Sequence, residues 1–238
     1  MSWFDHLLVF VFVVVLPYHG WRNYPKFIDL VARDPETVRR GVYLGNMIAL
    51  WGLMLTVAGA WGYFDRPFAQ LGLAPLTGLP AVVSLAVVLL VIAIAIIFYR
   101  AIMGLEKKYQ WAFVPELLPH TLPELRLFIG LSVTAGIAEE TLFRGYLIWY
   151  LSQFGGMTFA VIASSVLFAI AHAYQGAKAT IVIFPIGLLL ALLYVYSGSL
   201  LAPMMLHAAI NCYAGIYGRK MFGDGSDRKS GEDNDDGE

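Results

Sequence analysis

The sequence predicts an all-α polytopic membrane protein, a bundle of about seven transmembrane helices. Of its 238 residues, 59% are hydrophobic and only 14% are charged, whereas soluble domains carry about 25% charged residues. The mean hydropathy of +0.68 agrees with this class. Apolar stretches long enough to cross a hydrocarbon core of about 30 Å also recur along the chain.

We expect seven spans, joined by short connections. They are placed at residues 4–18, 42–64, 79–100, 125–152, 157–175, 179–197 and 200–217. Pro17 is expected to end the first span, because proline lacks the N–H that a helix interior requires. The pair Gly155–Gly156 is the expected turn between the fourth and fifth spans.

Basic residues gather in alternate connections. The first connection holds Arg22, Lys26, Arg33, Arg39 and Arg40, and the third and the tail are also basic. The fifth connection also holds a basic residue, Lys178. The even-numbered connections are nearly free of basic charge, since the second holds only Arg66 and the fourth and sixth hold none. The positive-inside rule then predicts the N-terminus outside and the C-terminus in the cytoplasm.

Charge and composition also bound the domains and partners. We expect residues 1–222 to form one integral membrane domain, and residues 223–238 to form an acidic, disordered cytoplasmic tail. The net charge of −1 argues against a nucleic-acid partner. We expect an integral, multi-pass membrane protein in the lipid bilayer. If the source is prokaryotic, this membrane is the inner or plasma membrane.

Several ionisable side chains interrupt the apolar spans. Glu139, Glu140 and Arg144 lie in the fourth span, His172 in the fifth, and His207 in the seventh. A charged residue at the centre of a bilayer costs about 2.5–3.5 kcal/mol on the insertion scale, so each is a functional hypothesis that needs a partner.

The spacing of these residues predicts how they meet. Glu140 and Arg144 are four residues apart on one helical face and can form an ion pair, whose role could also be purely structural. Glu139 is turned about 100° away and has no local partner. Glu139 and His172 lie symmetrically about Gly155–Gly156, so a helical hairpin turning there places both at the same depth.

The seventh span needs a special start to reach that depth. His207 and Asn211 share one helical face, but a full-length straight helix would leave His207 near the outer edge. We expect Ser197–Ala202 to be an extended segment that dips inward before Pro203. Asn46 is most simply an interhelical hydrogen-bonding residue, and Phe168 is most simply part of the core.

Two carboxylates, two imidazoles and an amide permit two mechanisms. In one, a glutamate activates water while histidine and amide groups stabilise the oxyanion. In the other, Glu and His side chains bind Zn²⁺, which lowers the pKa of its water. The chain has no H-E-x-x-H and no G-x-S-x-G motif, so zincin and serine-hydrolase chemistry is unsupported.

Three motifs carry a family resemblance. E-E-T-L-F-R (139–144), F-A-I-A-H (168–172) and H-A-A-I-N (207–211) resemble E-E-x-x-x-R, F-x-x-x-H and H-x-x-x-N of the CPBP family. This family contains type II CAAX prenyl endopeptidases and bacteriocin-processing or self-immunity proteins. The resemblance covers about residues 125–217, and the expected catalytic core is residues 120–217.

The resemblance implies an intramembrane endopeptidase with a conical helical cavity open to the cytoplasm and to lipid. Carried over by position, Glu139 is the base that activates water and His172 helps to hold that water. His207 and Asn211 would stabilise the oxyanion, while Glu140 and Arg144 would orient the site. The family has been described both as metal-dependent and as glutamic. We expect no cofactor here, with zinc as the less favoured alternative.

The substrate that the resemblance implies is a membrane-anchored protein or peptide, of CAAX type or with a C-terminal sorting signal. Two other functions compete with proteolysis. One is a non-catalytic scaffold or bacteriocin self-immunity protein of the same fold, which would not require Glu139 and both histidines together. The other is a transporter, for which the chain shows no inverted repeat.

Overall fold

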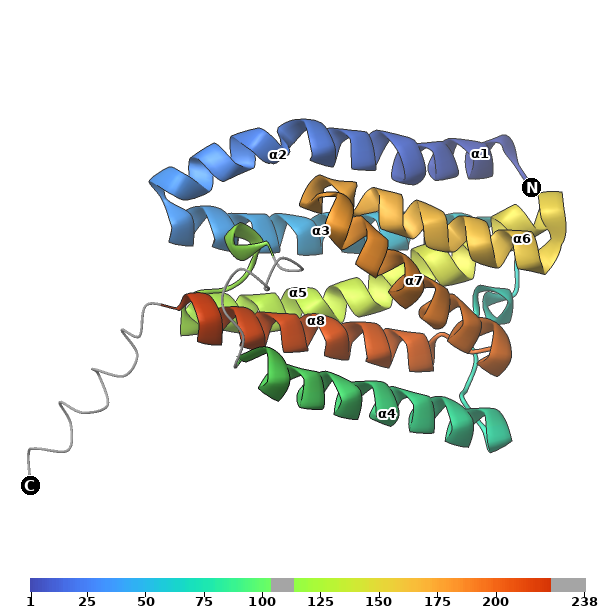
Figure 1. Ribbon diagram of the computed structural model, residues 1–238. Helices are drawn as coiled ribbons and strands as arrows, with labels where there is room; N and C mark the ends of the chain where they lie inside the picture. Colours follow the sequence, from blue (N-terminus) through green and yellow to red (C-terminus); the bar gives the residue numbers. More distant parts are fainter. Residues whose placement is uncertain (104–113, 224–238) are drawn as a thin grey trace, which may run out of the picture.

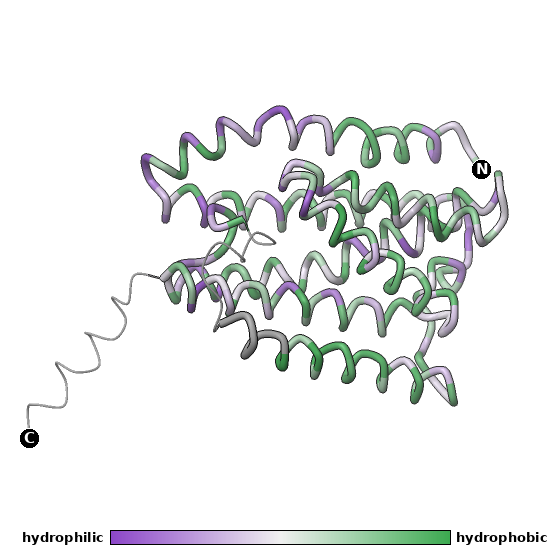
Figure 2. Tube along the Cα trace, in the orientation of Figure 1, coloured by the Kyte–Doolittle hydropathy of each residue, from purple (hydrophilic) through white to green (hydrophobic). Residues whose placement is uncertain are grey.

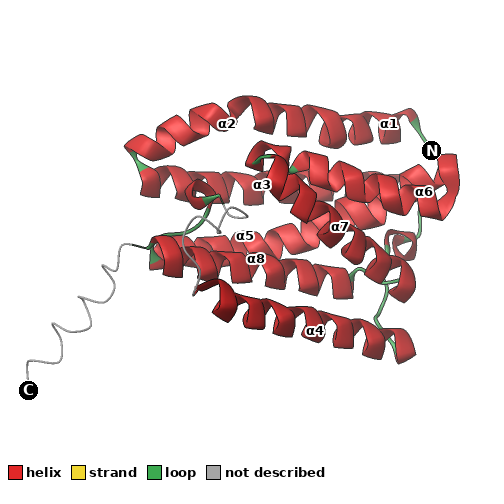
Figure 3. Ribbon diagram, in the orientation of Figure 1, coloured by secondary structure: helices red, strands yellow, loops and turns green. Residues whose placement is uncertain are grey.

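The computed structural model is a bundle of long helices, most of which run roughly along one direction (Figure 1). It describes residues 1–103 and 114–223, and these contain helices and loops without strands (Figure 3). The all-α fold predicted from the sequence is therefore confirmed.

Apart from Gly223, the predicted acidic tail lies outside the described residues. The elements are α1 (Trp3–Phe10), η1 (Val11–Val15), α2 (Leu16–Arg33), α3 (Pro35–Tyr63), η2 (Phe68–Leu71), α4 (Gly78–Met103), η4 (Pro115–Leu117), α5 (Leu122–Glu140), η5 (Thr141–Leu147), α6 (Ile148–Ala171), η6 (Ala173–Gln175), α7 (Ala177–Ser197) and α8 (Leu201–Phe222).

Within the described residues, five helical stretches are long and apolar enough to cross a membrane. These are Trp3–Arg33, Pro35–Tyr63, Gly78–Ile97, Leu122–Ala171 and Ala177–Ser197. Figure 2 shows that α4 is hydrophobic along most of its length, whereas α2 mixes hydrophilic and hydrophobic positions. The count of seven spans and the orientation stay predictions.

The first helix does not end at Pro17, so that prediction is wrong. The chain is helical from Trp3 to Arg33 without a break, because the π-helical segment η1 precedes the proline. In η1 the Leu16 N–H donates to the Val11 carbonyl, five residues back. Such a π turn absorbs the local mismatch that a proline introduces into the ladder of hydrogen bonds.

The predicted hairpin turn at Gly155–Gly156 is confirmed. Gly156 lies inside α6 with φ 72° and ψ −178°, a backbone conformation that only glycine adopts without strain. The chain reverses here, and the Ser164 hydroxyl donates across the hairpin to the Phe143 carbonyl at 2.8 Å. The two arms of the hairpin therefore pack directly against each other.

The connection into α8 is a tight turn, and the predicted extended segment Ser197–Ala202 is wrong. α7 continues to Ser197, Gly198 adopts a left-handed conformation with φ 66°, and α8 begins at Leu201. Ser199 and Leu200 of this turn are buried, and the Leu200 N–H donates to the Gly72 carbonyl at 2.9 Å. The connection after η2 thus satisfies the polar backbone at the start of α8, as buried irregular backbone in a membrane protein requires.

A glycine brings α5 and α8 into close contact. A Cβ atom built on Gly136 would lie 2.8 Å from the Met204 carbonyl oxygen of α8, closer than real Cβ contacts. Glu139 follows Gly136 by one turn of α5, and His207 follows Met204 by one turn of α8. The close approach of the two backbones therefore sets how near these two side chains come.

Candidate active site

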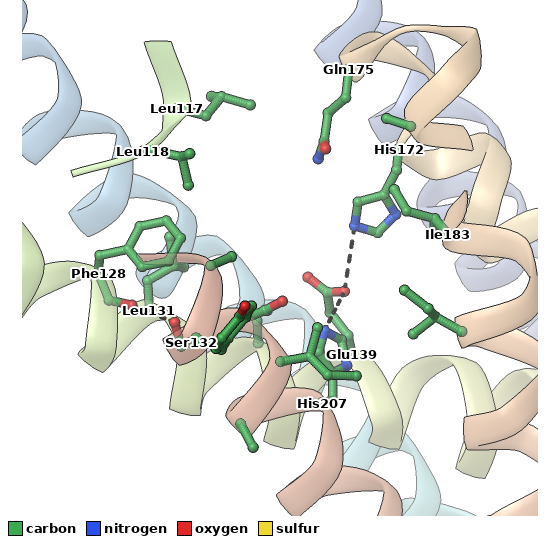
Figure 4. Close-up of a pocket in the computed structure, with 18 of the residues that line it drawn as sticks. Leu117, Leu118, Phe128, Leu131, Ser132, Glu139, His172, Gln175, Ile183 and His207 are labelled. Atoms are coloured by element: carbon green, nitrogen blue, oxygen red, sulfur yellow. Dashed lines mark hydrogen bonds and ion pairs between the residues drawn. The ribbon is translucent and has the colours of Figure 1, made fainter. Parts of the chain in front are cut away.

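A cavity of about 640 Å³ lies between α3, α4, α5, α7 and α8. Most of its lining is apolar, for example Leu131 and Ile183 (Figure 4). Four polar residues of the sequence motifs, Glu139, His172, His207 and Asn211, also line it. The structure therefore brings residues from three separate helices to one largely apolar space.

Glu139 lies between the two histidines (Figure 4). Its Oε2 atom is 3.9 Å from Nε2 of His172 and 3.9 Å from Nε2 of His207. This oxygen is buried and has no hydrogen-bond partner among the described residues. The separations are too long for direct hydrogen bonds, but each is short enough for one small polar molecule to bridge Glu139 and that histidine.

Each imidazole is held through its Nδ1 atom. Nδ1 of His172 is 2.8 Å from the Phe168 carbonyl oxygen, and Nδ1 of His207 is 2.6 Å from Oε1 of Glu140. A carbonyl oxygen and a carboxylate only accept, so the Nδ1–H groups donate to them. Both Nε2 atoms therefore face Glu139, in the arrangement by which proteins fix a functional histidine.

The predicted ion pair between Glu140 and Arg144 is present and fully buried. Nη1 of Arg144 donates to Oε1 of Glu140 at 2.9 Å, and Nη2 donates to the Gly187 carbonyl at 3.0 Å. The guanidinium also lies over the ring of Phe168, 4.2 Å from its centroid. Phe168 is thus buried in the core as expected, while its ring and carbonyl also contact site residues.

Two features near this ion pair were not predicted. The helix becomes π-helical directly after Glu140, in η5, although the sequence carries no pattern that marks it. Oε1 of Glu140 also binds His207, so this carboxylate joins Arg144 to a ring that faces Glu139. Sequence spacing does not show which side chain of α5 the His207 ring contacts, and so it gave no sign of this hydrogen bond.

The two asparagines differ in their surroundings. Asn211 lies one turn after His207 on α8 and lines the cavity, and its amide has no hydrogen-bond partner in the described part of the chain. Asn46 also lines the cavity, but its amide donates to the Val42 carbonyl of its own helix at 3.0 Å. The interhelical hydrogen bond expected for Asn46 is therefore wrong.

Two polar cavity residues close to His172 were not predicted from the sequence. Tyr174 and Gln175 lie two and three residues after His172, in η6, and both line the cavity. Gln175 points into the cavity beside His172 (Figure 4). The signal in the sequence was their position, since a polar pair two residues after a motif histidine lies where the fifth predicted span ends.

The histidines and glutamates do not match a zinc site as they are placed. Among the described residues, no three His, Cys, Asp or Glu side chains are arranged to hold a metal ion. Ligand atoms of a tetrahedral zinc site are about 3.3 Å apart, whereas Glu139 is 3.9 Å from each histidine. These donors would have to move inward to hold zinc.

Comparison with known proteins finds one family model that matches part of the chain. Residues 121–213 match the family model described as type II CAAX prenyl endopeptidase Rce1-like. Comparisons with curated proteins and with solved structures gave no match. The matched segment runs from the start of α5 into α8 and contains all three motifs. The family is integral to membranes, and with its long apolar helices the chain is a multi-pass integral membrane protein.

Proposed function

We propose that this chain, whose residues 121–213 form an Rce1-like type II CAAX prenyl endopeptidase domain, is an intramembrane endopeptidase that uses Glu139 to activate water. The family is a protease family, so a hydrolase acting on peptide bonds is the activity it suggests. The observation that carries the glutamate mechanism is the buried Oε2 of Glu139, which lies unpartnered between two imidazole nitrogens.

In the proposed reaction, a water molecule is held by Glu139 and His172. Glu139 accepts a proton from this water as the oxygen attacks the carbonyl carbon of the scissile bond. Glu139 then returns the proton to the leaving amine nitrogen as the C–N bond breaks. Both steps require the carboxylate oxygen to be free, and a side chain already committed to an ion pair, such as Glu140, is unsuited to them.

The developing oxyanion needs hydrogen-bond donors. The free amide of Asn211 and Nε2 of His207 lie on the same face of α8 and are our proposed donors. Because Nδ1 of His207 already donates to Glu140, Nε2 donates only when the ring carries a proton on both nitrogens. Glu140 and Arg144 orient that ring through Nδ1. The role of Arg144 is to keep the Glu140 carboxylate in place, because its own contacts are buried away from the cavity.

We propose that the reaction needs no metal ion. The 3.9 Å between Glu139 and each histidine is longer than the spacing of about 3.3 Å between zinc ligands, and it favours a bridging water. A zinc enzyme with the same residues would bind the ion through the two Nε2 atoms and Glu139, and the ion would supply the acidic water. Removal of metal by a chelator separates the two cases.

The proposed substrate is a membrane-anchored protein or peptide. A largely apolar cavity favours a cleaved segment without charged side chains near the scissile bond, because an unpaired charge is costly to desolvate. We take a prenylated CAAX peptide as the first probe, with C-terminal sorting peptides as the second. The proposed mouth of the cavity faces the cytoplasm, in keeping with the distribution of basic residues.

A non-catalytic scaffold is the competing function. An unpartnered buried carboxylate oxygen costs about 1–3 kcal/mol. Oε2 of Glu140 is also unpartnered among the described residues, but its carboxylate is held by Arg144, whereas a scaffold has no need to place Oε2 of Glu139 between two imidazole nitrogens. The test is to incubate the purified full chain in nanodiscs with a farnesylated CAAX peptide and to analyse products by mass spectrometry. We expect wild type to release the C-terminal tripeptide and Glu139→Gln to release none. Intact peptide with wild type, for this probe and for sorting peptides, would favour the scaffold.

A further inference from the structure

His172 stands just beyond the end of a helix rather than within one. α6 ends at Ala171, and His172 has φ −99° and ψ 5°. The short element η6 follows, and then Gly176 with φ 99°. Within α6, the His172 ring contacts the Phe168 carbonyl through Nδ1 and the Phe168 ring at 4.7 Å between centroids. Its remaining ring contact is with a residue that follows Ala171.

Tyr174 packs on the ring of His172. The two rings are 6.4 Å apart between centroids and nearly parallel, at 23°. Tyr174 also contacts Tyr24 of α2, with ring centroids 5.6 Å apart. Tyr174 lines the main cavity and also the small pocket between α2 and η6, so it forms a wall between the two.

The helix that carries Tyr24 is anchored at its start. Asp5 is fully buried and binds Arg66 through two hydrogen bonds of 2.8 and 2.7 Å. The hydroxyl of Tyr146 donates to the same carboxylate at 3.1 Å. Because α1, η1 and α2 form one unbroken helix, this anchor also limits how far Tyr24 can move away from η6.

We propose that the N-terminal helix positions His172 through the ring contacts Tyr24–Tyr174–His172, which makes Tyr24 and Tyr174 positioning residues. The catalytic consequence rests on the function proposed above, but the structural claim does not. Tyr24 lies outside the matched family segment of residues 121–213. The first helix is then part of the working site, although it contributes no motif.

Loss of the Tyr24 ring should lower kcat and leave KM unchanged. Tyr24 does not line the main cavity, so its loss should leave substrate binding, and hence KM, unchanged. A less restrained His172 should spend less time facing Glu139, which lowers kcat. An aromatic pair contributes an amount that corresponds to roughly 2–10-fold in an equilibrium, and we expect kcat to fall by a similar factor in Tyr24→Ala.

A chemical probe tests the structural claim without any substrate. Diethyl pyrocarbonate modifies accessible histidines, and the side chain of His172 is 20% exposed. We expect Tyr24→Ala to raise the modification rate at His172, measured by peptide mass spectrometry, by roughly 2–10-fold. The matched control is Tyr18→Ala on the same helix, since Tyr18 is 55% exposed and its ring contacts only that of Trp21 among the described residues.

The outcomes separate the two proposals. Equal modification rates at His172 in wild type and Tyr24→Ala would overturn the inference, whether or not the protein is a protease. If wild type cleaves no probe, the proposed function fails and the modification rates still decide the role of Tyr24. In an active enzyme, Tyr24→Phe should restore kcat because it keeps the ring. If Tyr24→Ala does not fold, Tyr24→Leu gives the same test with more of the volume retained.

Discussion

The same substitution at two adjacent glutamates should have very different effects on the stability of the folded state. Glu139→Gln should abolish cleavage and leave the folded state nearly as stable as wild type, because Oε2 of Glu139 makes no hydrogen bond among the described residues. Glu140→Gln should destabilise the folded state strongly. It removes the charge that compensates Arg144, whose side chain is 0% exposed.

The expected size of the second effect follows from the burial of the pair. Removing one partner of a buried ion pair costs about 3–5 kcal/mol, because the other charge stays buried without compensation. For a chain of this length, 1 kcal/mol shifts Tm by about 2–4 °C, which gives a fall of roughly 6–20 °C. Glu140→Gln also weakens the hydrogen bond that fixes the His207 ring, so its activity should fall as well.

The assay is thermal unfolding of the purified variants in the same detergent, followed by tryptophan fluorescence. The double variant Glu140→Gln/Arg144→Met should be less destabilised than the two single changes added together, since it removes both charges. A Glu139→Gln variant as unstable as Glu140→Gln would refute the different environments assigned to the two carboxylates. A Glu140→Gln variant with the same Tm as wild type would refute them as well.

Two further substitutions test the packing that supports the site. Gly136→Ala should reduce cleavage and destabilise the fold by about 1–3 kcal/mol, because the added Cβ would push α5 away from α8. The control Gly130→Ala should be neutral, because its Cβ meets its nearest atom at an ordinary 3.5 Å. Equal activity and stability in the two variants would contradict this account. Asp5→Asn should lower the free energy of unfolding by about 3–5 kcal/mol, because it leaves Arg66 without its buried partner. Glu36→Gln, which breaks an exposed pair, should lower it by only about 0–1 kcal/mol. Denaturation of both variants measures the contrast, and a similar small loss in each would count against a buried anchor.

The sequence predicted those parts of the fold that depend on local pattern. Apolar stretches indicated the helices, and Gly155–Gly156 indicated the hairpin, because a glycine pair is the natural place for a helix to reverse. Pro17 misled the prediction, since a π turn next to a proline lets the helix continue. The turn before α8 also differed from expectation, because its backbone is satisfied by Gly72, a residue distant in sequence.

The candidate site was predictable to the extent that it follows helix geometry. Spacing placed Glu140 with Arg144 and Glu139 at the depth of His172, and the structure has both arrangements. The contact between Glu140 and His207 depends on how α5 and α8 pack, which no local pattern encodes. The contact of Tyr24 with Tyr174 likewise joins helices that are far apart in sequence.

The central claim is that Glu139 activates water without a metal ion. The most direct measurement is the rate of cleavage of a farnesylated CAAX peptide by wild type and Glu139→Gln, after chelation and with metal content determined by mass spectrometry. We predict that wild type, freed of stoichiometric metal, keeps its full rate and that Glu139→Gln, although folded, releases no product. Loss of the wild-type rate on chelation and its return with Zn²⁺, or cleavage by Glu139→Gln, would contradict the claim.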